Sequence, residues 1–165
     1  MGIFSFVKGI GEKLAGHKES APAVTPSAAP AAPKAPTAQE IANLLLARVQ
    51  ALNLGIDGLS IHYDATADTA EIKGAAKSQA DREKAILAVG NVDHVEKVVD
   101  SISVASPEPE SKFYTVKSGD NLSKISKEVY GDANRYQKIF EANQPLLTHP
   151  DKIYPGQVLR IPALA

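Results

Sequence analysis

The chain has 165 residues, with 18 Lys and Arg against 19 Asp and Glu, so its formal net charge is -1 at pH 7. A charge this close to zero gives no general attraction for polyanions, and we expect no nucleic-acid partner. The sequence contains no cysteine, which excludes disulfides, thiolate zinc sites and thiol nucleophiles and fits a reducing compartment. A chain of this length can form one domain or two small ones.

Residues 1–19 carry a helical pattern. Ile3, Val7, Ile10 and Leu14 recur at the spacing of one helix face, with polar residues between them. Charged residues interrupt this run before it reaches the roughly 7–15 apolar residues of a secretion signal, and no later segment approaches the ~18 needed to span a bilayer. We therefore expect a short amphipathic helix that packs on the following domain, no transmembrane segment, and a cytoplasmic protein.

Residues 20–37 consist almost entirely of Ala, Pro, Ser, Val and Thr. Frequent prolines remove amide donors and favour extended polyproline geometry, so this stretch cannot form a packed core. We predict a semi-rigid linker over 20–37.

Residues 38–105 predict an α+β domain. Thr37 is a suitable N-cap because Glu40 follows three residues later, which is the spacing of a capping box. Apolar residues then alternate as in half-buried strands, and Ser78 marks the start of a second helix. The expected elements are a helix after Thr37, strands at Leu59–Tyr63 and Ala70–Lys73, a helix from Ser78 to Gly90, and a strand at Val95–Val104.

This order of helix, strand, strand, helix, strand resembles a BON domain. The stretch Ala-Val-Gly-Asn-Val-Asp-His-Val-Glu-Lys-Val, at residues 88–98, is the part that most resembles that family. Residues 106–111, with two prolines and two glutamates, form a second predicted linker.

Residues 112–165 carry a more specific pattern. Phe-Tyr-Thr-Val-Lys-Ser-Gly-Asp-Asn-Leu begins at Phe113, and Ile-Tyr-Pro-Gly-Gln-Val-Leu-Arg-Ile-Pro begins at Ile153. We expect a strand through Tyr114, a turn at 118–120 that caps a helix, and a closing strand at 158–161 after the Pro-Gly turn. These motifs resemble a complete LysM domain, which implies a strand, helix, helix, strand fold.

The sequence gives no support for catalysis. It contains no phosphate-binding glycine loop, no Gly-x-Ser-x-Gly elbow and no His-Glu-x-x-His motif. We therefore expect a non-enzymatic binding protein without an organic cofactor.

The whole arrangement resembles a bacterial family of potassium-binding proteins that combine one BON and one LysM domain. The resemblance implies a monomeric cytoplasmic K⁺ binder or sensor that becomes more compact with the ion, and for which Rb⁺ or Cs⁺ could substitute. By position, it implies that the ligands are main-chain carbonyls, those of Val7, Lys8, Ile10, Gly90, Val92 and Val95. Such a site is chemically reasonable because the last carbonyls of a helix lack intrahelical donors and carry partial negative charge.

The LysM resemblance implies an alternative ligand. LysM domains bind N-acetylglucosamine polymers such as peptidoglycan or chitin in a shallow groove between two loops, so an adaptor for glycan, protein or a membrane surface is the second interpretation. Turn, cap and core roles would also account for most of the residues in these loops. The predicted groove comprises Gly119, Asp120, Asn121, Leu122, Asn143, Gln144, Pro145, Ile153 and Tyr154.

Overall fold

The computed structural model describes residues 2–6, 36–92 and 94–164. Residues 7–35, which hold most of the predicted N-terminal helix and of the Ala/Pro linker, lie outside the described residues. Within the described ranges, no helix is both long enough and apolar enough to cross a membrane.

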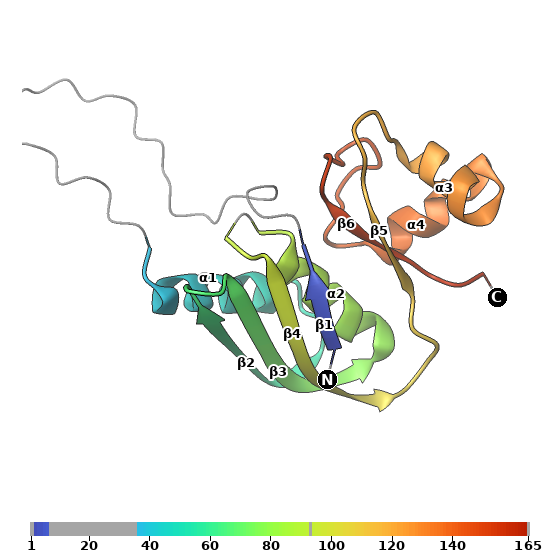
Figure 1. Ribbon diagram of the computed structural model, residues 1–165. Helices are drawn as coiled ribbons and strands as arrows, with labels where there is room; N and C mark the ends of the chain where they lie inside the picture. Colours follow the sequence, from blue (N-terminus) through green and yellow to red (C-terminus); the bar gives the residue numbers. More distant parts are fainter. Residues whose placement is uncertain (1, 7–35, 93, 165) are drawn as a thin grey trace, which may run out of the picture.

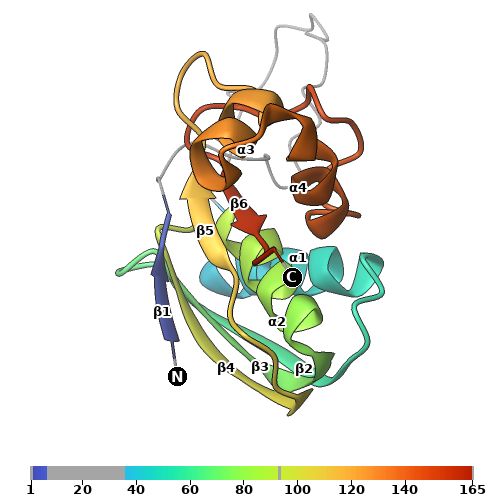
Figure 2. The ribbon, with the colours of Figure 1, turned by 90° about the vertical axis from the view of Figure 1, so that its right-hand side faces the viewer.

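The N-terminal domain has the predicted α+β order. It comprises α1 (Ala38–Ala51), β2 (Ile56–Asp64), β3 (Thr69–Ser78), α2 (Gln79–Gly90) and β4 (Lys97–Ser106). β2 and β3 form an antiparallel hairpin, whereas β3 and β4 are parallel and are connected by α2, as a parallel pair requires. Both helices pack on one face of the sheet, so the core lies between the helices and the strands (Figures 1 and 2).

Local signals explain where these helices begin and end. Thr37 and Glu40 form the predicted capping box, in which the Thr37 side chain accepts from the Glu40 N–H at 3.2 Å and the Glu40 carboxylate accepts from the Thr37 N–H at 2.7 Å. Asn53, with φ of 51°, turns the chain after α1. Ser78 caps α2 by accepting from the N–H of Asp81. The predicted helix starts are therefore confirmed.

The first described residues correct the helix predicted for residues 1–19. Gly2–Ser5 forms a strand, β1, which pairs antiparallel with β4 and completes the sheet order β1-β4-β3-β2. Ile3 is 73% exposed, although the helical pattern placed it on the buried face. A short isolated helix is marginal, and the edge of β4 offers a row of unpaired amides and carbonyls, so pairing with this edge is favoured.

The C-terminal domain has the predicted strand, helix, helix, strand order. It comprises β5 (Lys112–Thr115), α3 (Leu122–Tyr130), the 3₁₀ turn η1 (Ala133–Arg135), α4 (Tyr136–Ala142) and β6 (Val158–Ile161). β5 and β6 pair antiparallel. The domain has a core of its own, formed by Val116, Leu122, Ile125, Ile139, Leu147, Leu159 and Ile161.

The cap of α3 differs from the prediction by one residue. Asn121, not the preceding turn, is the N-cap, and its side chain accepts from the Lys124 N–H at 2.8 Å. Asp120 instead closes the turn by accepting from the Lys117 N–H at 2.9 Å. Both residue types suit a cap, and only the backbone path decides which one takes the position.

The two domains pack against each other. Val158 of β6 is buried in the core cluster of the N-terminal domain, and Phe113 of β5 packs against that cluster. The ring of Phe113 also meets the ring of Phe4 edge-on, with centroids 5.2 Å apart. The C-terminal domain therefore contacts both α2 and the N-terminal strand, as Figure 2 allows the reader to follow.

Candidate functional site

The turn from α2 to β4 contains three of the carbonyls that the family resemblance implies as ligands. Gly90 is the last residue of α2, and Val92 and Val95 are fully buried beyond it. The N–H of Asn91 donates to Leu87 O at 2.9 Å and ends the helix, and the N–H of Val95 donates to Val92 O at 3.0 Å. We call residues 90–95 the junction.

Groups from three other parts of the chain hold the backbone within the junction and on either side of it. Arg48 of α1 donates to Ala88 O at 2.9 Å, and the Tyr63 hydroxyl of β2 donates to His94 O at 2.6 Å. The N–H of Phe6 donates to the carbonyl of Glu96 at 2.7 Å. One long-range hydrogen bond therefore reaches the junction itself, and two hold the residues that flank it.

Phe6 also packs directly on Gly90. A Cβ atom built on Gly90 would lie 2.0 Å from Cζ of Phe6, far inside contact distance, so a larger residue at this position would displace the ring. Phe6 is 8% exposed. The contact brings the N-terminal segment to the end of α2.

The other three predicted carbonyls follow Phe6 in the sequence. Val7, Lys8 and Ile10 lie outside the described residues. Sequence reasoning missed the role of Phe6. The signal for it was the alternation of Gly2, Phe4 and Phe6, which is typical of a strand with one buried face.

The chemistry of the helix end favours a cation. The C-terminus of a helix carries roughly half a negative charge. The last turn of α2 contains no basic residue of its own, and the Arg48 guanidinium of α1 reaches one of its carbonyls, that of Ala88. Within the described ranges, no group of three or more His, Asp or Glu residues is placed to hold a metal. The donors predicted at this place are main-chain oxygens.

A second candidate site lies on the C-terminal domain. A surface hollow of about 340 Å³ separates the start of α3 from the loop that leads to β6. Two predicted groove residues, Asn121 and Leu122, line it, and the sequence analysis missed four others. These are Ser123, Tyr136, Pro150 and Asp151.

The other predicted groove residues lie outside the lining of this hollow, and two of them have structural roles. The Asn143 side chain is buried and grips β6, accepting from the Arg160 N–H at 2.7 Å and donating to Arg160 O at 2.8 Å. The Asp120 carboxylate accepts from the Tyr114 hydroxyl at 2.9 Å as well as closing its turn. Gly119, Gln144, Pro145, Ile153 and Tyr154 complete the set outside the lining.

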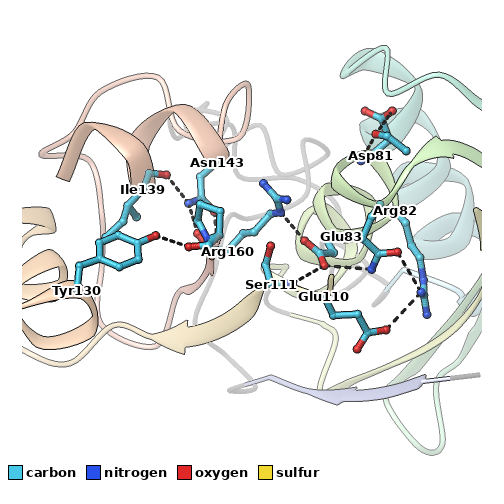
Figure 3. Close-up of polar contacts among 12 residues, drawn as sticks. Asp81, Arg82, Glu83, Glu110, Ser111, Tyr130, Ile139, Asn143 and Arg160 are labelled. Carbon is cyan, nitrogen blue, oxygen red and sulfur yellow. Dashed lines mark hydrogen bonds and ion pairs between the residues drawn. The ribbon is translucent and has the colours of Figure 1, made fainter. Parts of the chain in front are cut away.

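A buried polar cluster joins the two domains (Figure 3). Glu83 of α2 pairs with Arg160 of β6, and their side chains are 3% and 11% exposed. Glu83 also accepts from the Ser111 N–H at 2.8 Å and from the Gln79 amide at 3.1 Å. Burial acts to raise the pKa of Glu83, but these three donors outweigh burial and hold the pKa below its usual value.

Both domains of the chain match known families. Residues 36–106 match the BON domain model, and residues 114–162 match the LysM domain model. The chain is also 46% identical over 165 residues to the potassium binding protein Kbp of Escherichia coli O6:H1, a match that covers 98% of this chain and 99% of that protein. The chain belongs to the Kbp family. Because BON and LysM are binding domains, this member of the Kbp family is a binding protein and not an enzyme.

Two further relatives match only part of the chain. An uncharacterized protein of Deinococcus radiodurans is 55% identical over 49 residues, which are 30% of this chain and 19% of that protein. The uncharacterized protein YqbP of Bacillus subtilis is 37% identical over 60 residues, or 31% and 27% of the two chains. Among these three relatives, only the Kbp match covers both domains of this chain.

Proposed function

We propose that this protein binds K⁺ through main-chain carbonyls of the N-terminal segment and the junction. The donors would be the carbonyls of Val7, Lys8, Ile10, Gly90, Val92 and Val95. The observation that carries the proposal is the packing of Phe6 on Gly90, because it brings together the two segments that hold these residues. The near full-length similarity to the Kbp protein of E. coli adds to this support.

Neutral carbonyls suit a large, weakly hydrated monovalent ion. Ca²⁺ and Mg²⁺ generally recruit carboxylates, and the sequence of the junction offers none apart from Asp93. Rb⁺ and Cs⁺ carry the same charge and are also weakly hydrated, so we expect them to substitute for K⁺ more readily than Na⁺.

Binding would couple to conformation because the ligands come from two segments separated by a long spacer. An ion held by both segments stabilises the state in which β1 and Phe6 are docked, and the docked population rises with ion concentration. We further propose that the protein is a monomeric K⁺ sensor of the cytoplasm. Cell fractionation tests the location, and recovery in the envelope would contradict it.

Thermal unfolding in exchanged salts tests ion binding directly. At constant ionic strength, replacing Na⁺ with K⁺ over about 0–50 mM should raise the midpoint along a saturable curve, since the stabilisation follows RT ln(1 + [L]/Kd). Rb⁺ and Cs⁺ should act similarly. Identical midpoints in Na⁺ and K⁺ would contradict the proposal.

Two deletions locate the site. A chain that lacks residues 2–11 loses three predicted carbonyls together with Phe6, and we expect its midpoint to become insensitive to K⁺. A matched deletion of ten residues, 21–30, within the Ala/Pro spacer removes none of the donors and should keep the response. If both deletions respond to K⁺ as the full chain does, the N-terminal segment does not contribute ligands.

The hollow on the C-terminal domain favours glycan binding as a second candidate function. Tyr136 lies beside polar Asn121 and Asp151 in that lining, and an aromatic face with neighbouring polar groups suits a sugar ring. Calorimetry with an N-acetylglucosamine hexamer should then show binding that Tyr136→Ala abolishes and that the exposed substitution Lys138→Ala leaves unchanged. The absence of heat with the unaltered chain would exclude this candidate.

A further inference from the structure

Asn91 is a buried polar residue that connects the two domains. It is 8% exposed and follows the last residue of α2. Its side-chain amide donates to Val158 O at 2.9 Å and accepts from the Val158 N–H at 2.9 Å. The amide therefore pairs with both backbone groups of one residue in β6, as a neighbouring strand would.

This pairing leaves little freedom to either partner. Val158 is itself 5% exposed, so a broken pair would leave backbone donors and acceptors away from water. Two hydrogen bonds to one residue fix the orientation of the amide plane as well as its position. The end of α2 is thereby tied to β6.

The position of Asn91 in the chain connects this tie to the predicted carbonyls. Gly90 C=O and Asn91 N–H belong to the same planar peptide unit, so the bond from Asn91 N–H to Leu87 O aims the Gly90 carbonyl away from the helix, along its axis. Val92 follows Asn91 directly. A rotation of the Asn91 backbone would therefore turn the Gly90 carbonyl directly and would displace Val92, which carries its carbonyl in the peptide unit after its own Cα.

We infer that Asn91 is a positioning residue of the K⁺ site. It holds the Gly90 and Val92 carbonyls in place through the two hydrogen bonds from its side chain to the backbone of Val158 in the LysM domain. The inference rests on the proposed K⁺ binding. Asn91 is assigned no contact with the ion; its side chain acts through the backbone of its neighbours. Loss of the side-chain amide should weaken K⁺ binding although every carbonyl ligand remains.

Calorimetric titration of the full chain with KCl, at constant ionic strength, tests this role. Asn91→Ala should raise the K⁺ dissociation constant at least about tenfold, which corresponds to roughly 1.4 kcal/mol. Asn143→Ala is the matched control, because Asn143 makes the same double contact with Arg160 of β6 and lies within the LysM domain. We expect the control to lower the thermal midpoint in Na⁺ while leaving K⁺ affinity within about twofold of the unaltered chain.

The outcomes separate the two proposals. If the unaltered chain gives no heat with K⁺, the proposed function fails and this inference fails with it. If the unaltered chain binds K⁺ and Asn91→Ala binds equally well, only the role of Asn91 is overturned. Equal losses in Asn91→Ala and Asn143→Ala also overturn it, since they would reflect the stability of the LysM domain. If Asn91→Ala does not fold, the same titration is made with Asn91→Ser, because serine is a small polar residue that helix ends accept.

Discussion

At the scale of single residues, Gly90 is constrained by a ring rather than by its own backbone. Its φ is not in the left-handed region, and the space above its Cα is filled by Phe6. Gly90→Ala should therefore displace Phe6 and cost about 1–3 kcal/mol, the usual cost of overpacking a core. Urea unfolding measures this loss, and the K⁺ response of the midpoint should weaken with it.

A double-mutant cycle supplies the control for Gly90. In a Phe6→Ala background the ring is gone, so adding Gly90→Ala should cost much less than it does in the unaltered chain. Equal costs in both backgrounds would show that the methyl group disturbs α2 itself and not the docking of Phe6.

The same pair shows what a sequence cannot reveal at this scale. Residues 2–6 fit a helical face and an alternating strand about equally well over so short a stretch. The choice depends on β4, which pairs with β1 although Phe4 and Val98 lie 94 residues apart. The sequence predicted that a helix ends at Gly90, but it could not predict that the Phe6 ring, far away in the sequence, packs on this glycine.

At the scale of elements, α1 depends on its capping box. Thr37→Ala removes the acceptor for the Glu40 N–H and should cost about 1 kcal/mol of unfolding free energy. Thr148→Ala, an exposed threonine in the α4–β6 loop, is the control and should change stability by less than about 0.5 kcal/mol. Chemical denaturation compares the two, and equal effects would contradict a capping role for Thr37.

Elements whose sequence signals lie close to them along the chain were predictable. The caps at Thr37 and Ser78, the end of α2 and the LysM turn motifs each lie within a few residues of the structure they determine. β2 and β3 proved longer than predicted, and β2 begins at Ile56, three residues before its predicted start. Pairing with β3 extends such a strand, and local hydrophobic alternation carries no information about pairing. β4 lies two residues later than the predicted Val95–Val104, at Lys97–Ser106, because Val95 still belongs to the turn and donates to Val92 O.

At the scale of the whole molecule, the domain interface was absent from the sequence analysis. Its polar contacts join residues far apart, since Glu83 and Arg160 are 77 positions apart and Asn91 and Val158 are 67 apart. No local spacing distinguishes Glu83 from a solvated helix residue. The lining of the hollow on the LysM domain was only partly named for the same reason, because Tyr136 reaches it from α4 and Asp151 from the loop that leads to β6.

The interface should make the stability of the molecule depend on pH through Glu83. Its pKa is lowered in the folded state from an ordinary value of 4.5, so its contribution is fully present above about pH 4.5 and is lost as the pH falls through the folded-state pKa. Glu83→Gln keeps the shape but removes the charge opposite Arg160, and should cost about 1.5–3 kcal/mol at pH 7. Thermal midpoints measured from pH 7 to pH 3 should therefore fall more steeply for the unaltered chain than for Glu83→Gln.

Asp120→Asn is the control, because the pKa of Asp120 is also lowered, chiefly by the Lys117 N–H, while Asp120 lies away from the domain interface. Adding Asp120→Asn to both chains should leave the difference between the unaltered chain and Glu83→Gln in place. Parallel curves for the unaltered chain and Glu83→Gln would show that the ion pair with Arg160 does not hold the domains together.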